Sequence, residues 1–576
     1  MKLTEITIVN YCSCANVTLS LNSFTPLIGY NNAGKSNILR AIIWLLKKSV
    51  LGSAKFFDES KAVVISGKIS GVQLSVLPVN QQTQVQKFLV DDCLSFRRTQ
   101  NSPTAKATDI KLEVLDPATG VWEANPTGID NAIGALFPEP IFVEAMDDAS
   151  NDVAQYAAKN TIGLLLKNTL EQIKTNNAVA LNNLVASLSA AATHLNGQSR
   201  IAEFSDFEVQ ATNSLNEFFP GLKVHLTMQA PTIDDVLKTA SIGLSEGAGS
   251  ARGFTSFGHG TQRSVQMALI NLLANQLRPT SAGQSTTLLL IDEPELYLHP
   301  HAIELLRESL QKISANGFQV IMTTHSPLLI GDCILDTVIV HKDSGKTDVR
   351  KKLADVAATI SGALHQAAVV FSLQNASYLL FSENVLIVEG KTEKMVVPDL
   401  YLVVRNNSLA RSKTCLIEVC GSSSITPTLK VLKAVGFTGK AIVDLDYAFK
   451  LAPNDRPTLN TNSDYVACKN WFTNNTVNFN YILGADGFPS KGAIGQISAA
   501  KAFEEMAKAM PQEVQRIATI LLSDDLWVWR RGAIEAHLGI AKTDIDRLNF
   551  INIAKTSSNL NHSADAQSLI DCMNWV

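Results

Sequence analysis

The sequence lacks any C-x-x-C pair among its eight cysteines, which argues against a zinc ribbon, a zinc hook and a disulfide framework. It also lacks a basic balance, because the formal net charge is −4, so any nucleic-acid path must be local. The N-terminal MKLTEITIVNY is typical of a strand and not of a signal peptide, and no apolar run reaches transmembrane length. We therefore expect a cytoplasmic protein of several domains, with no membrane partner.

A phosphate-binding loop is the first motif that the sequence does contain. GYNNAGKS at 29 to 36 follows the apolar run 24 to 28 and precedes apolar residues at helical spacing. Backbone N–H groups of such a loop surround phosphates, while Lys35 contacts the outer phosphates and Ser36 ligates Mg²⁺. The alternative is a glycine-containing turn that only enters a helix. The expected ATP-binding residues here are Asn31, Asn32, Gly34, Lys35, Ser36 and Asn37.

The acidic partner of that loop is TTLLLIDEPELYLHP at 286 to 300. Its apolar strand ends in Asp292 and Glu293, and unpaired charge at the edge of a core is costly. We expect Asp292 to hold Mg²⁺ through water and Glu293 to be the general base that orients the attacking water. The next apolar strand, 319 to 323, is followed by His325. This histidine resembles the γ-phosphate-sensing histidine of ABC-type ATPases; alone, it would more often be a hydrogen-bonded histidine at a strand end.

SFGHGTQRSVQMALINLLA at 256 to 274 opens a predicted helix and resembles a divergent ABC signature, with Ser256 and Gly258 facing nucleotide. In ABC and SMC-like ATPases this segment caps the nucleotide of another subunit, which implies a homodimer or a dimer of dimers. The departure from L-S-G-G leaves the hydrolysis rate open. Residues 151 to 235 have helical patterns but are too short for a coiled-coil arm. We expect a helical dimerisation insert, with internal core helices as the alternative.

A second kind of chemistry follows in the C-terminal part. The strand 384 to 388 leads to Glu389, and Glu393 comes one helical turn later. The strand 440 to 443 leads to Asp444 and Asp446, which strand alternation places on one side. Such hard oxygen ligands suit Mg²⁺ or Mn²⁺, although an acid at a strand end often only caps a turn. The pattern resembles the Toprim fold.

An ABC-type ATPase with EPELYLHP, followed by a Toprim with E-G-x-T-E, resembles the overcoming-lysogenisation-defect (OLD) family of nucleases. Gabija-type and retron-associated nucleases share this layout. The resemblance implies an α/β chain: an ATPase over 1–150 and 236–352, the insert 151–235, a helical connector 353–383, and a Rossmann-like Toprim domain over 384–576. It assigns Glu389, Glu393, Asp444 and Asp446 as metal ligands. It also implies a late acid and a lysine, for which Glu535 and Lys555 are candidates; Asp524 and Asp525 are rivals of Glu535.

The function that the resemblance implies is ATP-regulated, metal-dependent cleavage or nicking of DNA in defence against phage. A retron reverse transcriptase with its RNA and DNA, or a helicase, would then be a partner. The main alternative is a DNA-binding clamp or sensor of RecF or SMC type without nuclease activity. A topoisomerase or primase is weaker, because neither an active-site tyrosine nor a zinc module is recognisable. Candidate DNA contacts are Arg97 and Arg98; Arg350, Lys351 and Lys352; Arg405, Arg411 and Lys413; and Arg530 and Arg531.

Overall fold

The structure is a computed structural model of the 576-residue chain. It describes residues 1–124, 129–136, 140–145, 165–166, 169, 176–196, 200–227, 241–247, 249–276, 287–359, 379, 381–419, 421–490 and 494–576. The chain divides into two compact units, one made of Met1, Gln73–Val85 and Asn131–Met322, the other of Lys2–Val72, Gln86–Asp130 and Thr323–Val576. The division into five segments predicted above differs from this grouping and stays a prediction.

An antiparallel six-stranded sheet opens the chain and belongs to the second unit. Its strands alternate buried and exposed side chains, as expected where only one face of a sheet covers a core. The predicted N-terminal strand is confirmed as its second member. In order across the sheet the strands are β2 (Cys14–Ser20), β1 (Lys2–Tyr11), β4 (Val63–Ser70), β5 (Leu94–Gln100), β6 (Lys111–Leu115) and β7 (Trp122–Ala124).

The phosphate-binding loop lies between β3 (Phe24–Ile28) and α1 (Lys35–Leu46), as predicted. All five residues of β3 are buried, which fits a strand covered on both faces. β3 pairs in parallel with β13 (Val338–Asp343), and β13 pairs antiparallel with β14 (Lys346–Val349). The loop therefore starts at the carboxyl end of a buried parallel strand, where α/β folds place their ligands.

The first unit contains the acidic strand. β11 (Thr287–Ile291) pairs in parallel with β8 (Ile141–Val143) and with β12 (Phe318–Thr324), which it contacts along residues 318 to 322. The predicted strands at 288–291 and 319–323 are thus confirmed. The helices of this unit are α2 (Val79–Gln86), α3 (Ile129–Leu136), α6 (Ala178–Asn196), α7 (Ala202–Asn216), α9 (His259–Gln276) and α10 (Pro300–Ala315).

The predicted helical insert is described only in part. The sequence pattern predicts helices at 161–173 and 177–195 within it. The second is largely helix α6, while most of the first lies outside the described residues. α6 corrects one expectation, since its residues Ala178–Leu195 are long and apolar enough to cross a membrane, with a mean hydropathy of 1.2 and none of the window buried. One such helix, judged by length and composition alone, is weak evidence for a membrane span. Of the connector 353–383, the helix α11 (Leu353–Thr359) is described.

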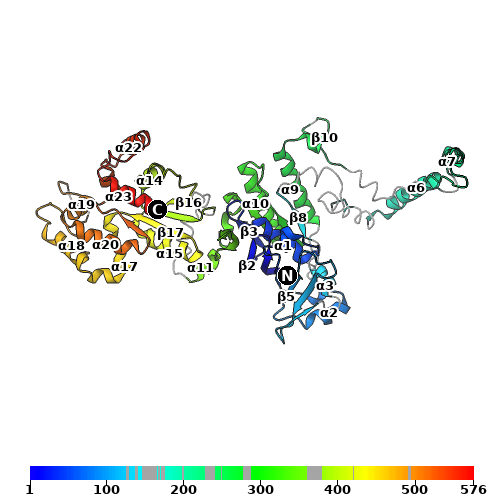
Figure 1. Cartoon of the computed structure of the whole chain (residues 1–576), viewed down its shortest axis with the longest axis horizontal. Coiled ribbons are helices and arrows are strands. Elements are labelled where there is room, and N and C mark those ends of the chain that lie inside the picture. Colours follow the sequence, from blue (N-terminus) through cyan, green and yellow to red (C-terminus); the bar gives the residue numbers. More distant parts are fainter. Residues whose placement is uncertain are drawn as a thin grey trace. The chain divides into compact units, whose positions relative to one another are not determined.

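Four parallel strands form the C-terminal sheet, in the order β16 (Thr414–Glu418), β15 (Asn384–Val388), β17 (Thr438–Val443) and β18 (Leu526–Val528). Helices cover both faces (Figure 1). On one face lie α14 (Lys391–Arg405), α21 (Ile534–Leu538), α22 (Asp544–Ser557) and α23 (Ala566–Trp575). On the other lie α15 (Ile425–Val435), α16 (Leu445–Lys450), α17 (Ala452–Asp455), α18 (Ser463–Asn474), α19 (Ala499–Ala509) and α20 (Pro511–Leu522).

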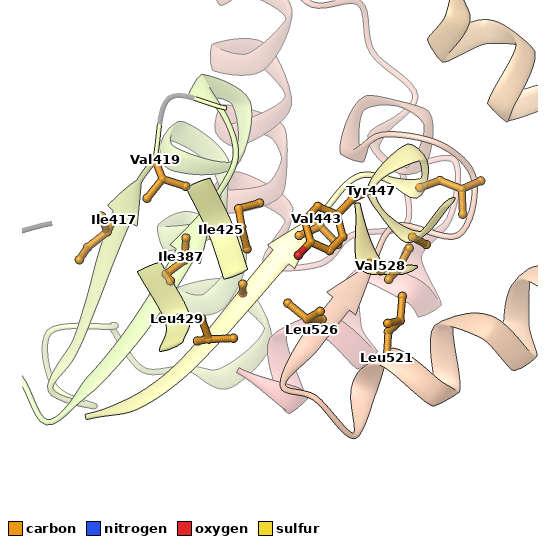
Figure 2. Close-up of a cluster of buried hydrophobic side chains, with 14 of the residues drawn as sticks. Ile387, Ile417, Val419, Ile425, Leu429, Val443, Tyr447, Leu521, Leu526 and Val528 are labelled. Atoms are coloured by element: carbon orange, nitrogen blue, oxygen red, sulfur yellow. The ribbon is translucent and has the colours of Figure 1, made fainter. Parts of the chain in front are cut away.

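The side chains of β15 show how this sheet is held. Val385 and Ile387 pack into the core on the α15 side, whereas Leu386 and Val388 pack into the core on the α14 side. Figure 2 shows the first of these cores, where Ile387 and Val443 from the strands lie near Ile425 of α15. A strand buried on both faces needs apolar residues at every position, as the predicted run 384–388 has. Burial on both sides fixes the strand, and with it the residue that follows at its carboxyl end.

Candidate functional sites

The phosphate-binding loop has the backbone that its glycines allow. Gly29 has φ 147°, and a Cβ there would lie 2.0 Å from the Val340 carbonyl oxygen. Gly34 has φ 109° and immediately precedes α1, and a Cβ there would lie 2.1 Å from the Thr347 hydroxyl. Both positions therefore require glycine. Asn31 and Asn32 of the loop are exposed, Ser36 is half-buried, and Asn37 donates to the Ser13 hydroxyl.

Lys35 is buried inside its own loop. Its Nζ donates to the carbonyl oxygens of Gly29 and Tyr30, at 2.9 and 3.2 Å. The same Nζ lies 2.9 Å from Nε2 of His325. The predicted lysine and the predicted sensor histidine are thus brought together, although 290 residues separate them in sequence.

The acidic strand places Asp292 and Glu293 in different environments. Asp292 is buried and its backbone N–H donates to the Val143 carbonyl oxygen, while Glu293 is half-buried with φ 46°. Positive φ in a residue with a side chain is a strained conformation that often accompanies function. Arg263, which the sequence analysis did not select, donates to the backbone carbonyl oxygens of both acids at 3.4 and 3.3 Å.

The signature-like segment precedes and begins α9. Ser256 ends a short 3-10 turn, Gly258 follows it, and the helix starts at His259. The sequence spacing predicts an apolar face of Val265, Leu269, Leu272 and Leu273. It is wrong in part, because Leu273 is buried but Leu272 is 48% exposed, and the buried face also includes Arg263 and Gln266. Arg263 is buried by its contacts with the acidic strand, and the spacing of apolar residues alone does not reveal such a contact. Helix α9 and the end of strand β11 are therefore held together within this unit by the hydrogen bonds of Arg263.

The C-terminal acids lie at the carboxyl edge of their parallel sheet. Glu389 directly follows β15, and Asp444 directly follows β17, the neighbouring strand. Glu393 lies in the first turn of α14, as predicted, and is buried. The Ser422 hydroxyl and the backbone N–H of Asp444 each donate to the Glu389 carboxylate. Adjacent parallel strands end side by side, so the carboxyl ends of β15 and β17 bring these acids together.

Two oxygen atoms of this group are shielded from solvent and have no hydrogen-bond partner. They are Oε2 of Glu389 and Oδ1 of Asp444. Each residue as a whole is half-buried, although these two atoms are shielded. An unpaired buried carboxylate oxygen costs free energy unless a proton or a cation compensates it. The donor set is therefore suited to a hard divalent cation.

The pKa values of these carboxyls show their mutual repulsion. Burial, followed by the charges of Glu535 and Glu389, raises the pKa of Glu393 to about 7. Burial, followed by the charges of Glu393 and Glu389, raises the pKa of Asp444 well above its ordinary value. Burial and the charge of Asp446 raise the pKa of Glu389. Five carboxyls thus repel one another in one place, as in sites where like charges share a proton or bind a cation.

Asp446 departs from its predicted position. β17 ends at Val443, Asp444 precedes helix α16, and Asp446 lies in the first turn of that helix. The prediction that strand alternation turns Asp444 and Asp446 to one side is therefore wrong, because no strand continues through them. The Asp446 side chain is 41% exposed and lies 3.9 Å from Lys450. Its charge still reaches Glu389 and Asp444.

Of the three candidates for the late acid, Glu535 is the one that joins this group. Glu535 is buried at the start of α21, accepts from the Thr392 hydroxyl at 2.6 Å, and raises the pKa of Glu393. Asp524 instead pairs with Arg456 at 2.6 Å, and Asp525 pairs with Lys433 at 2.5 Å. Both rivals lie in the turn before β18, at the end of that strand opposite to the carboxyl edge where the other acids lie.

The lysine among the acids is Lys542, which sequence reasoning missed. Its Nζ lies 3.5 Å from Glu535, and its charge also acts on Glu389, Glu393 and Asp444. Lys555 instead forms an ion pair of 2.7 Å with Asp399. Asp399 is six residues after Glu393 on α14, which places it about 9 Å farther along the helix axis. Lys542 precedes the N-terminus of α22 in a short loop, where no periodic pattern marks it.

The acids are near one another without forming a closed metal site. Within the described residues, no group of three or more His, Cys, Asp or Glu side chains is arranged so that it could hold a metal ion. The arrangement is consistent with carboxylates that repel each other across an open centre.

Comparisons with known proteins agree with this two-part organisation. Residues 122–331 match the family model described as "AAA domain, putative AbiEii toxin, Type IV TA system". Residues 380–446 match "Overcoming lysogenization defect protein-like, TOPRIM domain". The chain is also 35% identical over 557 residues to the Old nuclease of Escherichia phage P2, which covers 94% of this chain and 94% of that protein.

The chain belongs to the OLD nuclease family. It is accordingly an enzyme of a nuclease family with an ATPase domain followed by a Toprim domain. The chain is also similar to the Smc head domain of Pyrococcus furiosus, with 14% identity and a TM-score of 0.37 over 63% of this chain and 99% of that one. The SMC head domain of Thermotoga maritima gives 13% identity and a TM-score of 0.31, over 61% and 98%. Likenesses this distant support no conclusion about assembly.

Proposed function

We propose that this OLD family member is an ATP-binding, metal-dependent DNA endonuclease that cleaves or nicks its substrate at the Toprim edge. The observation that carries the proposal is the pair of shielded, unpartnered oxygens on Glu389 and Asp444, set among further acids at two neighbouring strand ends. A nuclease site needs such carboxylates because hard divalent cations are bound through them.

Mg²⁺ or Mn²⁺ would be held by Glu389, Glu393, Asp444, Asp446 and Glu535. When bound, such ions supply an activated water and stabilise the oxygen that leaves phosphorus. The chain's own contribution is to fix the acids. Thr392 donates to Glu535, and Arg547 donates to that same Thr392 hydroxyl at 2.9 Å, so the late acid is oriented by a hydrogen-bonded chain.

A cationic side chain completes this site. Lys542 takes the role that the family resemblance led us to expect of Lys555, because its charge acts on four of the five proposed ligands. Its ammonium group would neutralise charge that builds up on the phosphate during cleavage. Before substrate binds, the same charge partly offsets repulsion among the carboxylates.

The ATPase part would bind nucleotide through the loop that ends at Lys35 and Ser36, with His325 sensing the outer phosphate. Asp292 would hold Mg²⁺ through water, and Glu293 would orient the attacking water. Ser256 and Gly258 would cap a nucleotide bound by another copy, which makes a homodimer or a dimer of dimers the proposed assembly. The exposed apolar residues of α6, among them Val179, Leu184 and Val185, are consistent with an insert that packs on its twin.

The cellular role that fits these parts is defence against phage in the cytoplasm, with ATP controlling the Toprim site. A reverse transcriptase with its nucleic acid, or a helicase, is the proposed class of partner. The competing function is a DNA-binding clamp whose acidic edge is regulatory. That alternative lacks a reason for two buried oxygens without partners in the C-terminal acidic group.

Cleavage of plasmid DNA by the purified full chain distinguishes these functions. We expect nicked or linear product with Mg²⁺ or Mn²⁺ and none with EDTA, and we expect Asp444→Asn to abolish product while ATP binding is unchanged. Asp464→Asn, which removes an ion-paired acid elsewhere in the domain, is the matched control. Equal cleavage by wild type and Asp444→Asn would contradict the proposal, and binding of DNA without any cleavage would favour the clamp.

A further inference from the structure

A cavity of about 630 Å³ lies beside the acidic edge of the Toprim domain. Its lining includes Arg530, Arg531 and Lys508, together with the acids Glu504 and Asp565. The two arginines follow β18, the strand next to β17, so they occupy the same carboxyl edge as Asp444. Neighbouring strands lie about 4.8 Å apart, and the edge therefore changes from acidic to basic within one strand spacing.

Two backbone hydrogen bonds fix the arginines beside the acids. The N–H of Trp529 donates to the Val443 carbonyl oxygen at 3.0 Å, and the N–H of Leu445 donates to the Gly532 carbonyl oxygen at 2.7 Å. Asp444 is the one residue between these bonds on the segment after β17, and Arg530 and Arg531 are the two residues between them on the segment after β18. The loop cannot move away from Asp444 without breaking the pairing.

The charges of the cavity favour an anion. Glu504 is paired with Lys501 at 2.6 Å. Asp565 accepts a hydrogen bond from His537 at 3.0 Å and from the backbone N–H of Ser568 at 3.2 Å. Among the described residues, the guanidinium groups of Arg530 and Arg531 bond to neutral groups, the Gln515 side chain and the Ala564 carbonyl oxygen, and to no carboxylate. Their charges are therefore not neutralised by a bonded carboxylate. Glu504 is neutralised by Lys501, whereas Asp565 keeps its charge because burial lowers the pKa of His537 to about 4, so two arginine charges face one carboxylate.

Four of the other candidate basic residues are held by contacts within the fold. Arg97 pairs with Glu113, and Arg98 is buried against the Leu45 carbonyl oxygen. Arg350 stacks on Phe437, and Lys413 pairs with Glu383. Arginine presents a planar set of donors that matches a phosphate group, so the loop at 530 and 531 is the group that best fits a nucleic-acid backbone.

We propose that Arg530 and Arg531, with the cavity they line, bind a phosphodiester of the substrate DNA. This phosphodiester is the one next to the scissile phosphodiester on the same strand. This inference rests on the proposed nuclease function and adds a substrate contact to it. Five carboxylates around one lysine repel a polyanion, and a pair of arginines one strand away offsets that repulsion. A strand of DNA can then cross the edge with one phosphate over the acids and the next over the arginines.

The test is DNA affinity measured as a function of salt, with EDTA present so that no cleavage occurs. Each cation that neutralises a phosphate adds about 0.9 to the slope of log affinity against log salt. For Arg530→Gln/Arg531→Gln we therefore expect a slope lower by about 1.8. Wild type should then lose about 12-fold more affinity than the variant between 50 and 200 mM salt. With metal, KM for DNA should rise while kcat changes little.

Three comparisons make the result decisive. Arg530→Lys/Arg531→Lys should keep most of the salt slope, because lysine retains the charge although it lacks the planar donors of arginine. If the arginines had only a structural role, the glutamine and lysine variants would lose the slope equally. Arg516→Gln/Lys430→Gln removes two cations that are already paired with Asp464 and Asp455, and should leave the slope unchanged. Inorganic phosphate at matched ionic strength should not displace DNA; displacement would assign the cavity to a free anion.

An unchanged slope in Arg530→Gln/Arg531→Gln, with an unchanged melting temperature, would overturn the inference. So would an equal decrease of the slope in the glutamine and lysine variants. Failure of the nuclease proposal would show differently, as wild type that binds DNA with the expected slope and never cleaves it.

Discussion

Nζ of Lys35 lies 2.9 Å from Nε2 of His325, so the lysine meant for phosphate and the histidine meant to sense it contact each other directly. Two loop carbonyl oxygens hold the same ammonium group. Lys35 is thus oriented by acceptors within the ATPase part, and a nucleotide phosphate must share or replace them. This contact is where binding of ATP can first alter the protein.

We expect Lys35→Ala to weaken ATP binding about 10- to 100-fold, because a hydrogen bond from a charged donor contributes about 1.5–3 kcal/mol. His325→Ala should retain binding within a few-fold and slow hydrolysis. Calorimetric titration with a non-hydrolysable ATP analogue measures the first effect, and phosphate release measures the second. Lys48→Ala, at an exposed position just after α1, is the control. Wild-type affinity in Lys35→Ala would exclude the loop as the ATP site.

Glu293→Gln should bind ATP normally but hydrolyse it about 10²- to 10⁴-fold more slowly, because a positioned general base contributes on that order. Steady-state ATPase assays alongside nucleotide affinity separate the two quantities. Glu304→Gln removes an exposed acid from α10 and should behave as wild type. If Glu293→Gln turns over ATP at the wild-type rate, another residue is the base.

Lys542→Ala should reduce DNA cleavage strongly at saturating metal, since its ammonium group lies among the acids. Lys555→Ala removes an equal charge from an ion pair with Asp399 and should cleave DNA nearly as well as wild type. Single-turnover cleavage rates at saturating DNA compare the two variants directly. The reverse order of effects would restore Lys555 to the role expected from the family resemblance.

The stability of the metal-free protein should depend on pH through Glu393. Its pKa is raised from 4.5 to about 7, mainly by burial, so between these values the folded state binds a proton that the unfolded chain releases. Stability should therefore fall as pH rises through this window, by up to about 1.4 kcal/mol per pH unit. Urea unfolding with EDTA from pH 5 to 8 measures the slope.

Glu393→Gln should remove this part of the pH dependence, because it cannot titrate. Glu513→Gln, an ion-paired surface acid on α20, should leave the dependence as in wild type. Identical pH profiles for wild type and Glu393→Gln would mean that the carboxyl does not hold its proton in the folded state.

Much of the site could be predicted from sequence because each key acid stands at the end of an apolar run. The runs 288–291 and 384–388 correspond to β11 and β15, and the residue after each is positioned by the sheet. The position predicted for Asp446 is wrong because the strand ends at Val443 and a helix begins at Leu445. The alternation of side-chain direction along a strand therefore does not apply to Asp446. A strand and a helix are hard to distinguish over three residues.

The missed residues share a different cause. Arg263 bonds to a strand end about 30 residues away, and the charge of Lys542 acts with Asp444 and Glu393, about 100 and 150 residues away, which no local pattern encodes. Arg263 is a polar side chain on a buried helix face, so the apolar spacing of α9 did not point to it. Lys542 lies in a loop beside Glu535 and could be found only once α21 and α22 were placed.

Glu389 and Asp444 of the Toprim edge stand just outside the sheet, each at the point where a buried strand has ended. The strand interiors, which set the stability of the domain, are therefore separate from the residues that set its chemistry. Mutations at Glu389, Asp444 or the Arg530 loop can change metal choice or substrate preference without repacking either core. An evolving or engineered lineage could thus exchange one reaction on phosphate for another while inheriting the same scaffold.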